Sequence, residues 1–140
     1  MNIFSRLLYT PSRGTSVDLS LLLLRMAGGG FMLGHGYGKL QQVLSGNMEF
    51  GDPIGLGAET SLLLTVFAEF VCALMVLIGL FTRLATIPII ITMLVAVLLV
   101  HAGDEFGNKE AGLFFLVTNL VILLCGAGRY SLDYAMRRKR

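Results

Sequence analysis

The stretch "SLLLTVFAEFVCALMVLIGL", residues 61–80, decides the fold class of this chain. It contains a single charged side chain, Glu69. A helix that crosses a bilayer core of about 30 Å needs about 20 mainly apolar residues. The stretch therefore predicts a membrane-spanning helix, and its one carboxylate requires an explanation.

Three more segments meet the same criterion, at residues 19–38, 84–102 and 111–128. Of the 140 residues, 55% are hydrophobic and only 14% are charged, whereas a soluble domain averages about 25% charged residues. The apolar runs are continuous rather than alternating, which argues against a strand barrel. The sequence therefore predicts a single all-α domain over residues 1–140, an up-down bundle of four membrane helices.

The segment "MNIFSRLLYTPSRG", residues 1–14, precedes the first span. Its apolar residues follow helical spacing, which predicts a short amphipathic helix lying on the membrane surface. Pro11 would end that helix. No small-residue cleavage site follows the first apolar run, so we expect the segment to be retained.

The distribution of basic residues predicts the orientation of the spans. Eight lie on the side that holds both termini, and only Lys39 and Lys109 lie on the other. The eight are Arg6, Arg13, Arg83, Arg129, Arg137, Arg138, Lys139 and Arg140. We expect a multi-pass protein of the bacterial plasma (inner) membrane with both termini in the cytoplasm. The net charge of +2 is too small to indicate a nucleic-acid partner.

Two ionisable residues fall inside the predicted apolar layer, Arg25 and Glu69. An uncompensated charge at the bilayer centre costs at least about 2.5–3.5 kcal/mol. Counted from the expected ends of their spans, the two residues differ in height by about 8 Å, which an arginine side chain can bridge. We therefore predict an Arg25–Glu69 ion pair. The pair could fix the helix register, or it could polarise or protonate a bound molecule. Alternatively, Arg25 could extend to the inner surface without pairing with Glu69.

The first predicted span is rich in glycine, with Gly28, Gly29 and Gly30 at the expected height of Glu69. These three could form a cavity wall beside the carboxylate. Gly30, Gly34 and Gly38 are spaced four apart, which allows close approach of helix backbones. The glycines therefore indicate either ligand binding or helix packing.

His35 and Lys39 continue the stripe of Arg25 towards the outer surface, and His101 ends the third span near the same level. We expect these groups to contribute to a ligand site. His35, His101, Asp104 and Glu105 could together bind a divalent metal. No tight metal motif is present, so a metal site is the weaker interpretation. Cys72 and Cys125 lie in different spans and are interpreted as packed thiols.

Several stretches together resemble the DoxX family of small four-helix membrane proteins. They are "LLRMAGGGFMLGHGYGKL", "FAEFVCALMVLIGLFTRLAT", the histidine that ends the third span, and "GAGRYSLD". The resemblance extends from about Leu21 to Asp133. One member of the family is the membrane subunit of a thiosulfate:quinone oxidoreductase. Another belongs to a membrane oxidoreductase complex with a superoxide dismutase and a sulfurtransferase.

The resemblance implies a membrane subunit that is associated with an oxidoreductase, but it does not specify the reaction. Our first hypothesis is a subunit that is linked to a quinone or to thiols. The chain has no flavin, haem or iron–sulfur motif, so a redox group would be a bound quinone or belong to a partner protein. In this hypothesis Arg25 and Glu69 bind the polar head of a lipophilic molecule, and His35 or His101 exchanges protons with the outer side. We expect His35 to have this role, because it shares the face of Arg25. The alternatives are a binding or transport protein for a small molecule or metal, which as a transporter would need a homo-oligomer, and a scaffold for a soluble partner.

Overall fold

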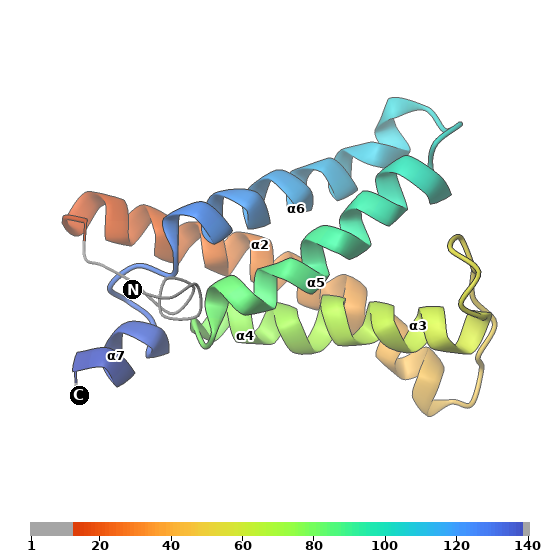
Figure 1. Cartoon of the computed structure of the whole chain (residues 1–140), viewed down its shortest axis with the longest axis horizontal. Helices are drawn as coiled ribbons and strands as arrows, with labels where there is room; N and C mark the ends of the chain where they lie inside the picture. Colours follow the sequence, from red (N-terminus) through yellow and green to blue (C-terminus); the bar gives the residue numbers. More distant parts are fainter. Residues whose placement is uncertain (1–12, 139–140) are drawn as a thin grey trace.

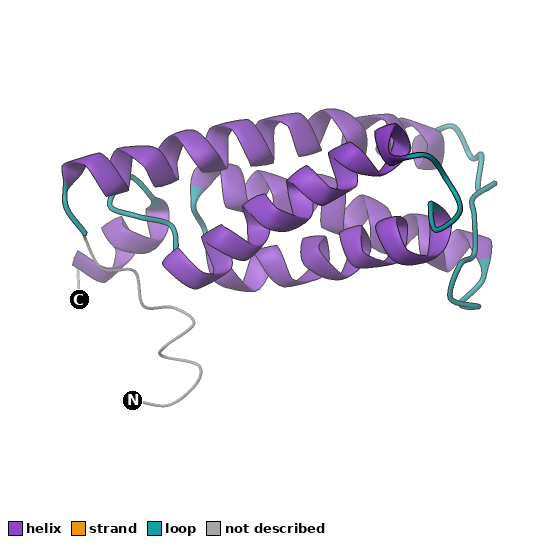
Figure 2. Ribbon diagram, turned by 90° about the horizontal axis from the view of Figure 1, so that it is seen from above, coloured by secondary structure: helices purple, strands orange, loops and turns teal. Residues whose placement is uncertain are grey.

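The structure, a computed structural model, describes residues 13–138, and these residues form helices without any strand. Four helical rods run back and forth along the long axis of the molecule (Figures 1 and 2). The first rod is α2 (Thr15–Leu44), and the second consists of α3 (Ala58–Val66), η1 (Phe67–Cys72) and α4 (Ala73–Ile78). The third rod consists of α5 (Thr82–Val95) and η2 (Ala96–Val100), and the fourth is α6 (Phe106–Cys125). The short helix α7 (Leu132–Arg138) follows the fourth rod. Each rod is long and apolar enough to cross a membrane. The predicted all-α membrane fold is therefore confirmed, whereas the predicted N-terminal amphipathic helix falls mainly on residues 1–12, outside the described residues.

Helix α2 is longer than the first predicted span. It has 30 residues, which corresponds to a length of about 45 Å and exceeds the bilayer core of about 30 Å. The expected span of 19–38 ended six residues before Leu44, where the helix ends. The level of Glu69 on α2, when it is counted back from the expected outer end, was therefore placed about 9 Å too near the start of the helix.

The rods pack closely at one end of the molecule and separate at the other. Helix α2 packs along α3, η1 and α4, and α5 packs along α6. In Figure 1 the α5–α6 pair diverges from α3 towards the α2–α3 loop. The core is formed by Met32, Cys72, Ala73, Val76, Ala85, Ile89, Met93, Phe115 and Ile122. Space for cavities therefore lies towards the divergent end.

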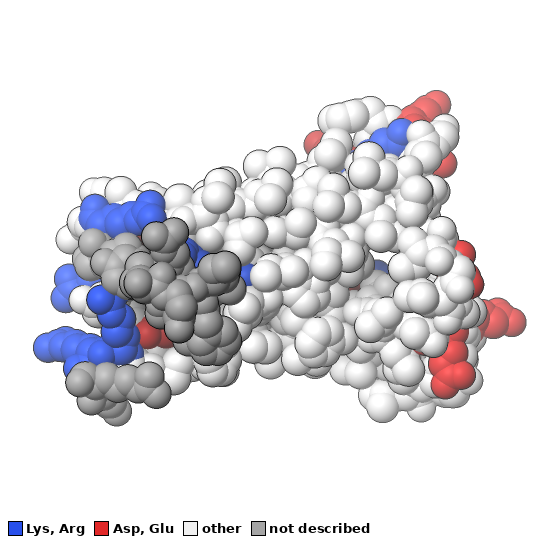
Figure 3. All heavy atoms as spheres, in the orientation of Figure 1, with Lys and Arg blue, Asp and Glu red and all other residues white. Residues whose placement is uncertain are grey.

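The two ends of the molecule carry opposite charge (Figure 3). The end where α2 begins and α6 ends carries Arg13, Arg83, Arg129, Arg137 and Arg138, and we call it the basic end. The divergent end carries Glu49, Asp52, Glu59, Asp104, Glu105 and Glu110, and we call it the acidic end. This separation matches the asymmetry seen in the sequence.

Asp133, just after the start of α7, closes the basic end by capping α5. Its carboxylate accepts hydrogen bonds from the backbone N–H groups of Phe81 and Thr82 at 2.7 and 2.9 Å, and from the Thr82 hydroxyl at 2.7 Å. The first N–H groups of a helix lack partners inside the helix, so this carboxylate satisfies them. The contact also holds Phe81 in a left-handed conformation, with φ of 44°.

Arg25 belongs to the same closure of the basic end. Its guanidinium is buried, and Nη2 donates a hydrogen bond to the backbone carbonyl of Tyr130. The buried carboxylate of Asp18 accepts the backbone N–H of Arg129 at 3.1 Å. Two buried polar side chains of α2 thus hold the segment between α6 and α7 against the bundle.

The predicted Arg25–Glu69 ion pair is wrong. Glu69 pairs with Lys39 instead. The backbone of Glu69 packs against Gly36, because a Cβ atom added to Gly36 would collide with it. Glu69 therefore lies six residues, or about 9 Å, further along α2 than the expected level of Gly30. The displacement equals the unexpected extension of α2.

The glycines of α2 that allow close packing are not the ones expected from the four-residue spacing. Gly29 and Gly36 lie against α4 and η1, and Gly28 lies against Thr118 of α6. Gly30, Gly34 and Gly38 are exposed, and a Cβ atom on any of them would meet nothing within 4 Å. Gly29 and Gly36 are seven residues apart, which is about two turns, so they share one face of α2.

We predict that Gly36→Ala destabilises the protein by about 1–3 kcal/mol, because the new methyl group meets rigid backbone rather than a movable side chain. Thermal unfolding in detergent can be followed with a thiol-reactive coumarin that reports exposure of the buried Cys72, in a Cys125→Ala background. Gly34→Ala is the matched control and should not lower the midpoint. Equal midpoints for the two variants would contradict the packing of α2 on η1.

We predict that Arg25→Gln lowers the free energy of unfolding by about 1–3 kcal/mol, because the Tyr130 carbonyl loses its charged donor. The same unfolding assay measures the loss. Arg129→Gln removes an exposed arginine from the same end and serves as control. An unchanged midpoint for Arg25→Gln would mean that the buried guanidinium does not support the closure.

Candidate functional site

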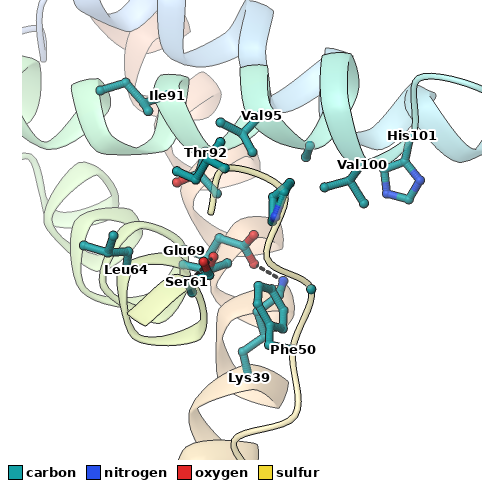
Figure 4. Close-up of a pocket in the computed structure, with 15 residues that line it drawn as sticks. Lys39, Phe50, Ser61, Leu64, Glu69, Ile91, Thr92, Val95, Val100 and His101 are labelled. Carbon is teal, nitrogen blue, oxygen red and sulfur yellow. Dashed lines mark hydrogen bonds and ion pairs between the residues drawn. The ribbon is translucent and has the colours of Figure 1, made fainter. Parts of the chain in front are cut away.

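The candidate site is built around an ion pair inside the apolar layer. Glu69 Oε2 and Lys39 Nζ are in direct contact, and the glutamate is only 5% exposed. Glu69 lies near the middle of the second rod, about 15 Å from either end at 1.5 Å per residue. Figure 4 shows the two side chains pointing toward one another from neighbouring helices. Each charge supplies the partner that the other needs in a medium of low dielectric constant.

The second and third rods each contain a segment of π-helix near the ion pair. Glu69 lies within η1, and η2 ends directly before His101. A π-helix is rare, is wider than an α-helix and often occurs at functional sites. Here the two π-helical segments contribute side chains to the same two cavities. The irregular backbone therefore coincides with the space around the ion pair.

The first cavity has a volume of about 360 Å³ and lies between the second and third rods. Its polar groups, apart from the ion pair, are the hydroxyls of Ser61, Thr65 and Thr92 and the His101 ring. The remaining lining is Phe50, Gly51, Pro53, Ile54, Leu64, Ile91, Val95, Ala96 and Val100. A mostly apolar cavity of this size with a few convergent polar groups is typical of a small-molecule site.

The α2–α3 loop covers part of the first cavity, and Asp52 holds the loop in place. The Asp52 carboxylate accepts the backbone N–H groups of Gly57 at 2.9 Å and Leu56 at 2.8 Å, and the Ser61 hydroxyl at 3.2 Å. These hydrogen bonds, chiefly that from Gly57, hold the pKa of Asp52 below its ordinary value. The stabilisation is therefore complete above the ordinary pKa and is lost as the pH falls through the lowered one.

The second cavity has a volume of about 220 Å³ and lies among α2, α5, η2 and α6. It is lined by Met32, His35, Lys39, Glu69, Met93, Ala96, Val97, His101, Asn108, Lys109, Ala111, Gly112 and Phe115. Lys39, Glu69, Ala96 and His101 also line the first cavity. The ion pair therefore forms part of the boundary between the two cavities.

Two histidines occupy this region with different surroundings. The ring of His35 stacks edge-on against Phe115, with a distance of 5.5 Å between centroids. His101 Nδ1 lies 2.7 Å from Asp104 Oδ2, which orients its ring at the acidic end. Only His101 lines both cavities. It is therefore the histidine with access to either side of the ion pair.

The structure brings together four of the residues singled out from the sequence, namely His35, Lys39, Glu69 and His101. Arg25 lies at the basic end, and Gly28, Gly29 and Gly30 line neither cavity. From the α2–α3 loop the sequence indicated only Asp52 as a group at the outer mouth, and it did not predict that Phe50, Gly51, Pro53 and Ile54 line a cavity. The glycines and Pro53 of that loop indicate ordered backbone, but no local pattern shows which surface it covers.

The alternative metal site is not assembled. Among residues 13–138, no three His, Cys, Asp or Glu side chains are close enough to hold a metal ion. Of the four candidate ligands, His101 and Asp104 meet as a pair, whereas His35 packs against an aromatic ring. The cysteines are free thiols, with Cys72 buried in the core and Cys125 at the end of α6.

Comparisons with known proteins agree with the resemblance seen in the motifs. The DoxX family model matches residues 20–102. The chain is also 29% identical over 119 residues to a protein of Bacillus subtilis (strain 168) named "Putative oxidoreductase CatD", covering 84% of this chain and 87% of that protein. No solved structure matches the chain significantly. The matched region includes most of α2, the whole of the second and third rods, and both residues of the ion pair. It covers more than half of the chain, so the chain belongs to the DoxX family of membrane proteins.

Proposed function

We propose that this protein is the membrane component of an oxidoreductase system and that it binds a small lipophilic molecule with a polar head, such as a quinone, in the first cavity. The observation that carries this proposal is the Lys39–Glu69 ion pair at the wall of a mostly apolar cavity inside the membrane. The similarity to a protein named as an oxidoreductase supports the link to redox chemistry.

The ion pair offers hydrogen-bonding groups for both redox states of a quinone. The Lys39 ammonium can donate to a quinone carbonyl oxygen, and the Glu69 carboxylate can accept from a quinol hydroxyl. Lys39 thus replaces Arg25 in the role expected from the sequence. The hydroxyls of Thr65 on α3 and Thr92 on α5 add further polar groups to the lining of the cavity.

The cavity favours a quinone-linked over a thiol-linked reaction. Neither Cys72 nor Cys125 lines either cavity, so neither thiol is placed to react with a molecule bound there. The sequence has no motif for a flavin, haem or iron–sulfur cluster. In this proposal electrons therefore come from a partner protein, and the membrane subunit binds and orients the lipophilic carrier.

The charge of the two ends supports a location in the bacterial plasma membrane with the basic end in the cytoplasm. Leu64, Ile91 and Val100 are each about half exposed at the edge of the first cavity. These apolar side chains lie on membrane-spanning rods. A ligand dissolved in the bilayer could therefore reach the cavity without crossing the aqueous phase.

We predict that Glu69→Gln weakens binding of a short-chain quinol by about tenfold to a hundredfold, because the quinol hydroxyl loses a charged acceptor and a hydrogen bond to a charged group contributes about 1.5–3 kcal/mol. Titration of the purified protein in lipid nanodiscs, with bound ligand quantified by mass spectrometry, measures the change. Glu59→Gln removes the same charge from the exposed first turn of α3 and serves as control. The proposal fails if no quinone co-purifies with the native chain and none binds on titration.

We predict that Asp52→Asn speeds ligand dissociation, because it weakens the hydrogen bonds that hold the α2–α3 loop over the first cavity. In the native protein the same acceleration should develop as the pH falls through the lowered pKa of Asp52, and the variant should lack this pH dependence. Dissociation rates measured by ligand exchange in nanodiscs test both effects. A native rate that is independent of pH would contradict a closing role for the loop.

A further inference from the structure

The two cavities open onto different surroundings. The first is bordered by Leu64, Ile91 and Val100, which are about half exposed on the apolar surface of the rods. The second is bordered by Asn108 and Lys109, which lie at the start of α6 at the acidic end. The lining of the second cavity also includes the core residues Met32, Met93 and Phe115, so this cavity extends from the acidic end into the interior.

The lining of the second cavity suits water. His35, Lys39, Glu69, His101, Asn108 and Lys109 all contribute polar groups to a space of about 220 Å³. A water molecule occupies about 30 Å³ in the liquid and needs two to four polar partners to remain in a buried site. The space can therefore hold several waters, with polar partners both at the acidic end and at the ion pair.

We propose that the second cavity is a water-filled inlet through which protons from the solution at the acidic end reach the Lys39–Glu69 pair. The existence of the inlet does not depend on what occupies the first cavity. Its use does rest on the proposed function, because a bound quinone exchanges protons whenever its redox state changes. The ion pair then separates a compartment for the lipophilic ligand from a compartment for water.

His101 is the relay at the mouth of this inlet. Asp104 engages Nδ1 at 2.7 Å, which leaves Nε2 to exchange a proton with water. A proton taken from hydronium by His101 passes to water in the inlet and then to the Glu69 carboxylate. Neutralised Glu69 releases Lys39, and the proton can pass to a ligand oxygen in the first cavity. In each of these transfers the accepting group gains the proton that the donating group loses.

The charged and titratable groups around Glu69 come from three elements. Lys39 and His35 lie on α2, His101 follows η2 with Asp104 beside it, and Lys109 lies on α6. Of these groups, Lys39 is in direct contact with the Glu69 carboxylate. The resting state is therefore the ion pair, and proton delivery is transient.

Val95 and Val97 provide a matched test because they are two residues apart but line different cavities. Val95 lines only the first cavity and Val97 only the second. We replace each with cysteine in the full chain in nanodiscs, in a Cys125→Ala background with the buried Cys72 retained. Labelling rates are measured with a charged sulfonatoethyl methanethiosulfonate and with its small, neutral methyl counterpart, which also reports whether each thiol can be reached.

We expect the charged reagent to label Val97→Cys faster than Val95→Cys on the order of a hundredfold, after division by the rates with the neutral reagent, because a charge enters an apolar environment at high cost. The background protein should remain unlabelled. Equal normalised rates, or faster labelling of Val95→Cys, would overturn the proposal. These measurements need no ligand, so they can succeed even if quinone binding fails.

Proton delivery has a separate readout. After a rapid pH drop, protonation of Glu69 is followed by its infrared carboxyl band, which is identified by its loss in Glu69→Gln. Val97→Phe fills the inlet and should slow protonation by tenfold or more, whereas Val95→Phe should not. Equal slowing by the two variants, or no slowing by either, would contradict the inlet. The cysteine variants provide an independent test if Val97→Phe does not fold.

Discussion

A carboxylate in the middle of a membrane helix must be neutralised, and the contact between Lys39 and Glu69 meets this requirement. Other features of the molecule towards the acidic end are arranged around this contact. Gly36 lets α2 approach the backbone of η1 closely enough for the two side chains to meet. The α5–α6 pair diverges from α3 towards the acidic end (Figure 1), and a cavity lies on each side of the ion pair. The same interaction thus stabilises two charges and sets the boundary between two cavities.

The charged groups of the two halves of the molecule have separate roles. Arg25 and Asp133 act at the basic end, where they fix the chain between α6 and α7 and cap α5. Lys39 and Glu69 act near the divergent end, where packing is looser. A preorganised site needs support that does not move with the ligand, and the closure of the basic end is suited to give it.

Length and apolar runs were sufficient to predict the class, the four rods and the asymmetry of charge, because these depend on local composition and on the thickness of a bilayer. The ion-pair partner could not be obtained in this way. It depends on where α2 ends, and the chain continues as helix through Leu44 although its outer residues are polar. The end of α2 was placed six residues too early, so Arg25 rather than Lys39 was predicted as the partner of Glu69. The role of Asp133 was also missed, because its contacts with Thr82 join positions far apart in the sequence.

The length of α2 has a consequence for the membrane itself. A rod of about 45 Å cannot lie wholly within hydrocarbon of about 30 Å without a steep tilt. If α2 stands near the bilayer normal, its last turns rise into the headgroup layer and carry the α2–α3 loop with them. The protein would then replace lipid headgroups above the first cavity with its own polypeptide. Lipids around it would have to match an uneven boundary, tall at α2 and shorter at the third rod of 19 residues.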